Sequence, residues 1–377
     1  MHKIEIFNVG NGNSALITLE NDRVMIVDFC DRVCADDVDN PKIDLGEHLK
    51  EAFRAKRRTE VDVFAITHLD EDHICGATEF FHLDHARKYQ GEGRIRIKTL
   101  WVPAGVLFEG DLGEEAKILQ SEARYRLKAG YGIRVFSRPE ALRSWCNANG
   151  VDFSAVQHLM TDAGRCAPGF TLANDGMEAF IHSPLARRID GTSTGTLIDR
   201  NQDCLVFQAR FVVNDAATDV LFTGDMTADG WTVIAEATRE HRNDGRLEWD
   251  LYNAPHHCSY KSVGHDRGRN MTPPTDDVRW ILEDLGRARG YIVSSSEPIP
   301  LPGTEADRSD QPPHRQAGAY YRQVADKASG RFLVTMEEPT IVKPKPLVFE
   351  IHWGGLKRIT VASFGSTLGS TPVGRAG

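Results

Sequence analysis

The sequence has little of what marks several classes of protein. Its 377 residues contain no run approaching the ~18 apolar residues that a membrane-spanning helix needs. The seven cysteines are odd in number and include no C-x-x-C pair, which argues against a disulfide scaffold or a structural zinc knuckle. A basic excess is also missing, because 45 Lys and Arg stand against 54 Asp and Glu. The net charge of −9 argues against a wide nucleic-acid surface, although it leaves room for a local groove.

The N-terminal residues Met1, His2 and Lys3 lead directly into a strand-like segment. Because no apolar stretch with a small-residue cleavage site follows them, we expect no signal peptide, a cytoplasmic location and no membrane partner. The composition, 41% hydrophobic and 26% charged, is that of an ordinary globular protein. Its length fits two or three domains, or one large α/β domain with insertions.

Short β-rich segments alternate with helical segments along the chain. Ile4 and Ile6 alternate with polar neighbours, whereas Leu45, Leu49 and Phe53 fall on one face of a helix. Further strand-like runs are expected at 14–19, 23–29, 61–67, 177–182, 204–213, 220–223, 249–254 and 291–295. Strands alternating with helices predict a layered α/β fold.

Two other regions, a long segment in the first half of the chain and the C-terminal segment, depart from this alternation. Residues from about 78 to 176 are mostly helical in character, with 114–128 closed by Gly130, and we interpret them as a helical insertion that covers something. Near the end of the chain, 347–353 and 356–361 flank a Gly-Gly pair and predict a hairpin. The Gly-, Ser- and Thr-rich tail after it is expected to be flexible.

A basic cluster closes the first helical segment, at Arg54, Lys56, Arg57 and Arg58. One interpretation is a phosphate-binding patch. Cations at a helix C-terminus also suit the helix dipole, however, and a solvated helix end is the favoured interpretation.

The densest polar chemistry follows a short buried strand, where residues 67–76 read T-H-L-D-E-D-H-I-C-G. His68, Asp70, Asp72 and His73 are four potential metal ligands within six residues, a spacing that suits a loop around one or two cations. Neighbouring carboxylates repel one another unless a cation offsets their charge. The alternative is an acidic surface loop with two incidental histidines.

Two later segments repeat the design of a strand followed by a ligand. An apolar strand leads through T-G-D to Asp225, and the strand at 251–254 leads through P-H-H-C-S to His256 and His257. Because ligands at the ends of separate strands meet at the edge of an α/β sheet, these segments predict one shared site there.

The motifs of this chain, in their order, resemble those of the metallo-β-lactamase fold. They are F-N-V-G-N-G-N-S and M-I-V-D-F near the N-terminus, then H-x-D-x-D-H, T-G-D and P-H-H-x-S. The similarity is to the branch that contains the nuclease-like domain of ComEC-type DNA-uptake proteins and the phosphorylcholine esterases. The resemblance implies an α/β fold, a four-layer αββα sandwich with a helical insertion, and a metal site at one sheet edge. The metallo-β-lactamase-like domain would span 1–330, with the insertion at about 78–176, a C-terminal β appendage at 331–362 and the flexible tail at 363–377.

The resemblance also implies a ligand set for two divalent metal ions, Zn²⁺ or Mn²⁺. His68 and Asp70 would bind one ion, Asp72 and His73 would bind the other, Asp225 would bridge them, and His256 or His257 would complete the second. The remaining ligand of the first ion falls on Asp203 or Asn201. A later H-P segment of the family corresponds to Pro312, Pro313 and His314, with the role of His314 left open.

Two glycines of the family motifs are replaced by Cys75 and Cys258. Either a small side chain is tolerated at both positions, or the two thiols lie close enough to the metals to tune them or to sense oxidation.

The function that this set favours is a metal-dependent hydrolase, a phosphodiesterase or nuclease in which a hydroxide activated by two metals attacks DNA, RNA or a nucleotide. Asp72 and His73 are the candidate catalytic residues, and Lys261 and Ser262 are candidate substrate contacts. The same site could serve a small-molecule phosphoesterase or a lactone or amide hydrolase. A third alternative is a non-catalytic, metal-bearing effector that acts through a protein partner docked on the helical insertion.

Overall fold

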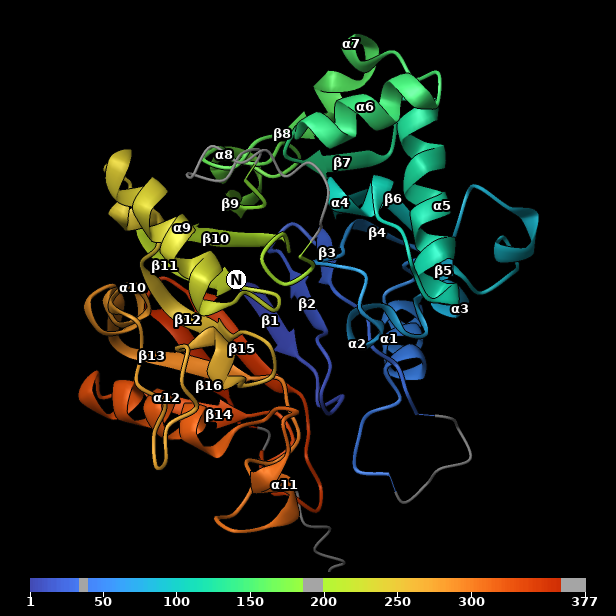
Figure 1. Ribbon diagram of the computed structural model, residues 1–377. Coiled ribbons are helices and arrows are strands. Elements are labelled where there is room, and N and C mark those ends of the chain that lie inside the picture. The colour runs from blue at the N-terminus through green and yellow to red at the C-terminus, as the bar shows by residue number, and fades with distance from the viewer. Residues whose placement is uncertain (34–39, 186–198, 361–377) are drawn as a thin grey trace, which may run out of the picture.

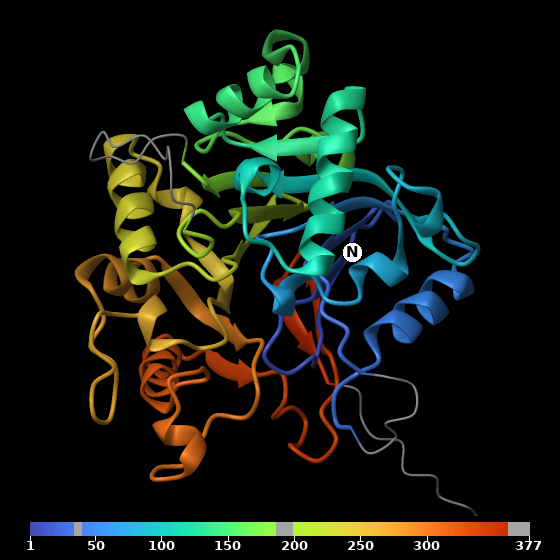
Figure 2. The same ribbon diagram turned by 45° about the vertical axis from the view of Figure 1, so that its right-hand side comes forward.

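The computed structural model describes residues 1–33, 40–185 and 199–360. Two mixed β-sheets pack face to face, and helices cover both outer faces (Figure 1 and, turned by 45°, Figure 2). The expected flexible tail at 363–377 lies outside the described residues.

The first sheet is built from both ends of the chain. Its strands are β1 (His2–Ile6), β2 (Ala15–Thr18), β3 (Val24–Val27), β4 (Glu60–Ala65), β5 (Phe81–His82), β6 (Ile95–Pro103), β7 (Ile133–Phe136), β8 (Met160–Thr161), β15 (Leu347–His352) and β16 (Gly355–Ile359). They follow the order β16-β15-β1-β2-β3-β4-β6-β7-β8, with β5 paired to β6. Pairing is antiparallel from β16 to β3 and parallel from β3 to β8.

The second sheet comes from the C-terminal half. Its strands are β9 (Met177–Ser183), β10 (Val206–Val213), β11 (Ala216–Phe222), β12 (Trp249–Ala254), β13 (Gly286–Ser294) and β14 (Arg331–Val334), in the order β14-β13-β12-β11-β10-β9. The pairs from β11 to β14 are parallel, so these strands end at one edge.

The helices are distributed over the two outer faces and the connections. The α-helices are α1 (Leu45–Ala55), α2 (Glu71–Ile74), α3 (Ala77–Phe80), α4 (Gly105–Phe108), α5 (Glu114–Ala129), α6 (Glu140–Ala148), α7 (Phe153–Val156), α8 (Leu172–Asp175), α9 (Ala228–Glu240), α10 (Asp276–Arg279), α11 (Glu305–Arg308) and α12 (Arg315–Lys327). Short 3₁₀ turns are η1 (Arg87–Tyr89), η2 (Gln157–Leu159), η3 (Asp244–Arg246) and η4 (Tyr260–Ser262), and η5 (Trp280–Asp284) is π-helical. No helix within these described ranges is long and apolar enough to cross a membrane.

Three clusters of buried apolar side chains separate the layers. The inner cluster joins the two sheets, with Met25 and Val63 from the first and Phe207 and Leu251 from the second. One outer cluster packs α1, α5 and α6 on the first sheet, and the other packs α9, α10 and α12 on the second. The layers therefore run helix, sheet, sheet, helix, which confirms the αββα arrangement that the resemblance implies.

Local sequence signals account for many of these elements. Asp44 caps α1 by accepting the N–H of Glu47 at 2.9 Å, and the apolar stripe of this helix is buried. Gly130, with φ +78°, ends α5 where the sequence places a C-cap. The expected C-terminal hairpin is present as β15 and β16.

Two expectations about domain organisation are corrected. The region 78–176 is not simply a helical insertion, because it supplies β6, β7 and β8, which continue the first sheet. The hairpin at 347–359 is not an appendage, because β15 pairs with β1 and extends the same sheet. Both errors arise because pairing between distant segments is not visible in local periodicity.

Candidate metal centre

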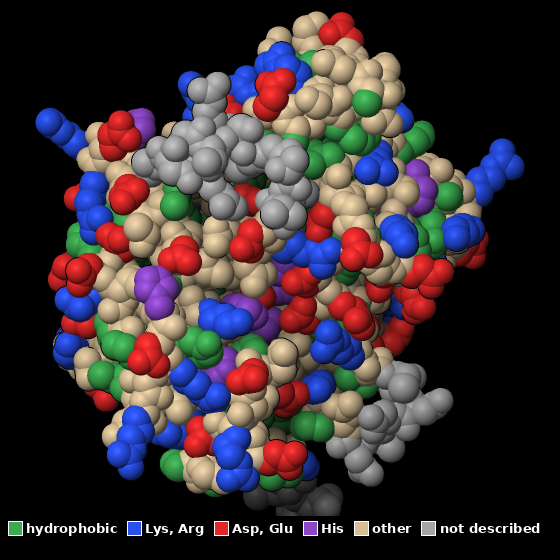
Figure 3. All heavy atoms as spheres, viewed as in Figure 1, with side chains coloured by type: hydrophobic (Ala, Val, Ile, Leu, Met, Phe, Trp, Pro, Cys, Tyr) green, Lys and Arg blue, Asp and Glu red, His purple; other side chains and the backbone are tan. Residues whose placement is uncertain are grey.

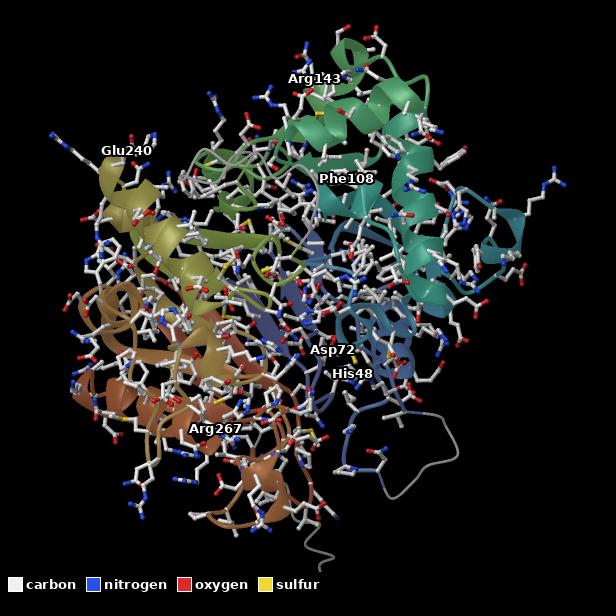
Figure 4. All side chains as sticks on the ribbon, viewed as in Figure 1. His48, Asp72, Phe108, Arg143, Glu240 and Arg267 are labelled. Atoms are coloured by element: carbon white, nitrogen blue, oxygen red, sulfur yellow. The ribbon has the colours of Figure 1, made fainter. Side chains whose placement is uncertain are left out.

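The predicted ligands meet where strands of both sheets end. The H-x-D-x-D-H loop follows β4 of the first sheet, while Asp225 follows β11 and the histidine pair follows β12 of the second. Asp72, a residue of α2, is labelled in Figure 4 between the two halves of the molecule. Figure 3 shows histidine side chains gathered near the centre of this face, with acidic and basic side chains around them.

Backbone geometry brings the two edges together. Gly224 has φ +51°, and a Cβ there would lie 3.0 Å from the sulfur of Cys204 and 3.2 Å from the Cβ of Thr67. The glycine of T-G-D therefore allows the edges to approach closely. His256, His257 and Cys258 all have positive φ, an energetically costly turn for residues with a Cβ. This turn presents the two neighbouring histidines to the same carboxylate.

Four side chains form the tightest group. The ligand atoms of Asp72, His73, Asp225 and His257 all lie within 4.8 Å of one another. Nε2 of His73 is 3.1 Å from Oδ1 of Asp225, and Nε2 of His257 is 2.9 Å from Oδ2 of Asp72. Except for Asp72, these side chains are almost completely buried.

A second group faces the other oxygen of Asp225. Nε2 of His68 and Nε2 of His256 each lie 3.8 Å from Oδ2 of Asp225. His68 is also 3.5 Å from a carboxylate oxygen of Asp70. Asp225 thus stands between the two groups, with Oδ1 toward His73 and Oδ2 toward His68 and His256.

The donor atoms are suited to a cation. Nε2 of His68, Nε2 of His73, Oδ1 of Asp225 and Nδ1 of His256 are all buried and make no hydrogen bond. Buried polar atoms without partners are costly, so the three of them that gather around Asp225, Nε2 of His68, Nε2 of His73 and Oδ1 of Asp225 itself, fit a cation site. Imidazole nitrogens and carboxylate oxygens together are the donors that Zn²⁺ and Mn²⁺ accept.

The Nδ1 atoms of His73 and His257, which point away from Asp225, are held by hydrogen bonds. Nδ1 of His73 lies 2.7 Å from Oδ2 of Asp28, and Nδ1 of His257 lies 2.8 Å from the carbonyl oxygen of Ser295. Because these oxygens accept the Nδ1–H, it is Nε2 of each ring that faces the site and can offer its lone pair to a cation once its own proton has left. Asp28 itself is fixed by the N–H and the hydroxyl of Thr67, at 2.7 and 2.8 Å.

The charges of the site shift its titration. Burial alone would raise the pKa of Asp225, but the neighbouring charges of His73 and His257 hold it well below its usual value. Burial likewise opposes the charged form of His73, yet Asp225 and Asp28 raise its pKa well above the usual value. The pKa of His257 is raised in the same way against burial, by Asp225 and Asp72. Without a cation, the site holds protons where a metal would bind.

Arg200 is a part of the site that sequence reasoning missed. Its guanidinium donates to Asp70 at 2.7 Å and also pairs with Glu109. Burial raises the pKa of Asp70, whereas His68 and Arg200 lower it to about 2. Asp70 therefore reaches the site as an ionised carboxylate that is shared between His68 and an arginine.

The remaining sequence candidates lie around this centre, and their roles stay predictions. The carboxylate of Asp203 accepts the N–H of Asp199 at 3.3 Å, and Asp203 is not part of the four-residue group. Lys261 is exposed and Ser262 is buried, both in η4 directly after the histidine turn. His314 is buried behind that turn, where its N–H donates to the carbonyl of Cys258 and its Nε2 has no partner.

Cys75 and Cys258, the two cysteines that replace glycines of the family motifs, do not contact each other; each has a different neighbour. The sulfur of Cys75 lies 3.9 Å from that of Cys30, whereas Cys258 directs its thiol toward the carbonyl of His314. Both Cys30 and Cys75 are buried, next to the loop that carries Asp72 and His73. Cys30 and Asp28 lie just after a buried apolar strand, the same signal that identified the other ligands.

No family model and no curated protein sequence matches this chain. Among solved structures, it is similar to a diphosphatase from the PhnP family (12% identity, 93% of this chain and 98% of that chain, TM-score 0.37). It is also similar to unliganded yeast PDE1 (10% identity, 88% and 97%, TM-score 0.40) and to Zn²⁺-bound PqqB from Methylobacterium extorquens (10% identity, 88% and 97%, TM-score 0.33). Similarity at this level says nothing about the activity of the chain, which has to be inferred from its own residues.

Proposed function

We propose that this protein is a metal-dependent hydrolase that cleaves phosphodiester bonds in nucleic acids or nucleotides. The observation that carries the proposal is the position of the buried Asp225, whose Oδ1 lies 3.1 Å from Nε2 of His73 and whose Oδ2 lies 3.8 Å from Nε2 of His68, two nitrogens that make no hydrogen bond within the described residues. A carboxylate placed in this way is suited to bridge two cations.

In this proposal, His73, His257 and Asp72 would hold one cation, His68, Asp70 and His256 would hold the other, and Asp225 would be shared between them. His256 would then take the role that the resemblance implies for Asp203 or Asn201. Burial lowers the pKa of His256, so its imidazole is neutral and available as a ligand at pH 7.

Two divalent cations bound here would lower the pKa of a coordinated water and offset the charge of a phosphodiester. His73 and Asp72 would have different roles beside these cations. His73 is fully buried, so it acts as a ligand and not as a group that touches substrate. Asp72 is part-exposed at the rim, and its pKa stays low despite burial because His257 and His73 favour the carboxylate. Its carboxylate therefore stays ionised, and it can orient a water by accepting a hydrogen bond from it.

The experiment is a metal and activity assay on purified protein. We expect about two Zn²⁺ or Mn²⁺ ions per chain, and hydrolysis of at least one substrate among single- and double-stranded DNA, RNA and cyclic nucleotides. The variant Asp225→Ala should lose the activity and most of the metal. The matched control is Asp229→Ala, because Asp229 is an exposed aspartate of α9 that pairs with the exposed His265. A metal-loaded protein that leaves every substrate intact would refute the proposal.

A small-molecule phosphoesterase is the second candidate, because the net charge of −9 disfavours a long polyanion. The two candidates differ in how activity responds to salt. Hydrolysis of a long nucleic acid should weaken steeply as salt rises, whereas hydrolysis of a small monoester or diester should change little.

A further inference from the structure

A basic hollow lies near the start of β4, whereas the metal centre lies beyond the end of that strand. It has a volume of about 710 Å³ and is lined by Lys50, Arg54, Arg57, Arg58 and Arg94, together with three glutamates. We refer to it as the arginine hollow. Five cations against three carboxylates give it a net charge of +2, in a chain whose net charge is −9. The hollow therefore concentrates positive charge against the balance of the whole molecule.

The arginine hollow is separate from the metal centre. Thr59, part of its lining, lies just before the first residue of β4, whereas the ligand loop follows the last residue of that strand. A six-residue strand spans ~20 Å at ~3.3 Å per residue, so Thr59 and the ligand loop are about that far apart, while Glu79 in the lining follows His73 by six residues. The helix α1, which supplies Glu47, Lys50 and Arg54 to the lining, lies at the edge of the molecule in Figure 2.

Several of the positive charges in the hollow are not neutralised. Lys50 pairs with Glu47 at 2.9 Å, and Arg58 lies 3.7 Å from Asp62. In contrast, Arg54 and Arg57 make no side-chain hydrogen bond or ion pair with any residue that the structure describes.

Arg94 is fixed in place but keeps its charge. Its guanidinium donates to the carbonyl oxygens of Thr78 and Phe81, the second at 2.9 Å. Carbonyl oxygens orient a guanidinium without cancelling its charge, so Arg94 is held ready for an anion. The Nε of Arg58 is also buried without a partner.

Arg57 follows the end of α1 with φ +53°, at a position where helices usually place glycine or asparagine. Arg242 has the same φ just after α9, so this backbone conformation is not particular to the hollow. What distinguishes Arg57 is that it lines the hollow together with four other cationic side chains.

We propose that the arginine hollow binds an oligophosphate anion, such as the phosphate chain of a nucleotide, independently of the metal centre. Guanidinium groups from the end of α1, from the turn after it and from the segment before β6 face the same space. A chain of phosphates offers several oxygens to such a set, each able to accept paired hydrogen bonds from arginine. The volume lies within the ~300–1,000 Å³ typical of small-molecule sites.

The test is a calorimetric titration of the full-length protein, freed of metal with a chelator, with inorganic triphosphate. We expect one triphosphate per chain and binding that weakens with salt. The double variant Arg54→Gln, Arg57→Gln should weaken binding at least tenfold. The matched control is Arg242→Gln, Arg289→Gln, which removes two other exposed arginines with φ of +53° and +65°. The control should bind triphosphate like the unchanged protein.

Parallel titrations with adenosine triphosphate and a ten-nucleotide single strand distinguish the sources of phosphate. Tighter binding of adenosine triphosphate than of triphosphate identifies a nucleotide site, and equal binding identifies a polyphosphate site. Binding of the oligonucleotide alone would overturn the proposal in favour of a nucleic-acid contact. It would also be overturned by no binding of triphosphate at millimolar concentration, or by equal loss in the test and control variants. Circular dichroism and metal content confirm that each variant is folded.

Discussion

Asp28 offers the sharpest test of how the metal centre is organised, because it touches no proposed substrate and acts through His73. In the variant Asp28→Asn, one carboxylate oxygen becomes an amide NH₂. In the unchanged protein, Oδ1 of Asp28 accepts the N–H of Thr67 and Oδ2 lies 2.7 Å from Nδ1 of His73. If the oxygen of the asparagine still accepts the N–H of Thr67, its NH₂ group takes the place of Oδ2 and faces Nδ1 of His73. His73 must then accept at Nδ1 and carry its proton on Nε2, so the atom that faces Asp225 is no longer a ligand.

The expected loss can be estimated from this contact. Removing a hydrogen-bond partner of a metal-binding histidine weakens metal binding by ~10–100-fold. Because both side chains are buried and water cannot replace the carboxylate, we expect the upper end, about 2.7 kcal/mol. Metal affinity is measured by competition with a chelator, and folding by circular dichroism.

Two further variants make the result decisive. Asp162→Asn is the matched control, since it removes the charge of an ion-paired aspartate, the partner of Arg138, at the end of β8. It should leave metal affinity unchanged. In a His73→Ala background, Asp28→Asn should have little further effect on affinity, because the two residues act as one unit. A folded Asp28→Asn protein with affinity within twofold of the unchanged protein would refute this account.

Three other predictions follow from particular contacts. The pKa of His73 is raised well above its usual value in the metal-free protein and that of His257 is raised, so both shifts favour the protonated side chains. Zinc binding should therefore release protons and tighten as pH rises; calorimetry in buffers of different ionisation enthalpy measures the release, and no release would contradict the shifts. His256→Ala should lower the metal content from about two ions to one per chain by elemental analysis, and an unchanged content would remove His256 from the ligand set. Glu122→Gln should lower the free energy of unfolding by about 3 kcal/mol in urea denaturation, because it removes the buried carboxylate that lies 2.6 Å from Nε of Arg126 and leaves that guanidinium with only the part-exposed Asp84, at 3.1 Å; a loss below 1 kcal/mol would contradict this.

Local signals in the sequence were sufficient for the elements whose causes are local. The cap and apolar stripe of α1, the glycine that ends α5 and the C-terminal hairpin all depend on residues within one or two turns of each other. The ligand loop is local in the same sense, because four donors within six residues restrict the chain to wrapping around one point. These features could be predicted because neighbouring residues fix them before any distant contact forms.

The parts of the site that depend on distant contacts could not be predicted in this way. Asp28 and Cys30 follow the same kind of buried strand as the ligands, yet only the pairing of β3 with β4 brings them beside His73 and Cys75. The contact of Arg200 with Asp70 joins residues 130 positions apart.

The sequence by itself determined that this protein carries a cluster of histidines and carboxylates at strand ends within a layered α/β fold. Only the tertiary structure decided how that cluster divides, because the directions of the adjacent His256 and His257 depend on a turn with positive φ. The tertiary structure also gathered Arg57 and Arg94, from segments far apart in the chain, around one hollow. The physical reason is the same in each case: residue types and their spacing fix which donors are available, whereas the packing of two sheets fixes which of them meet.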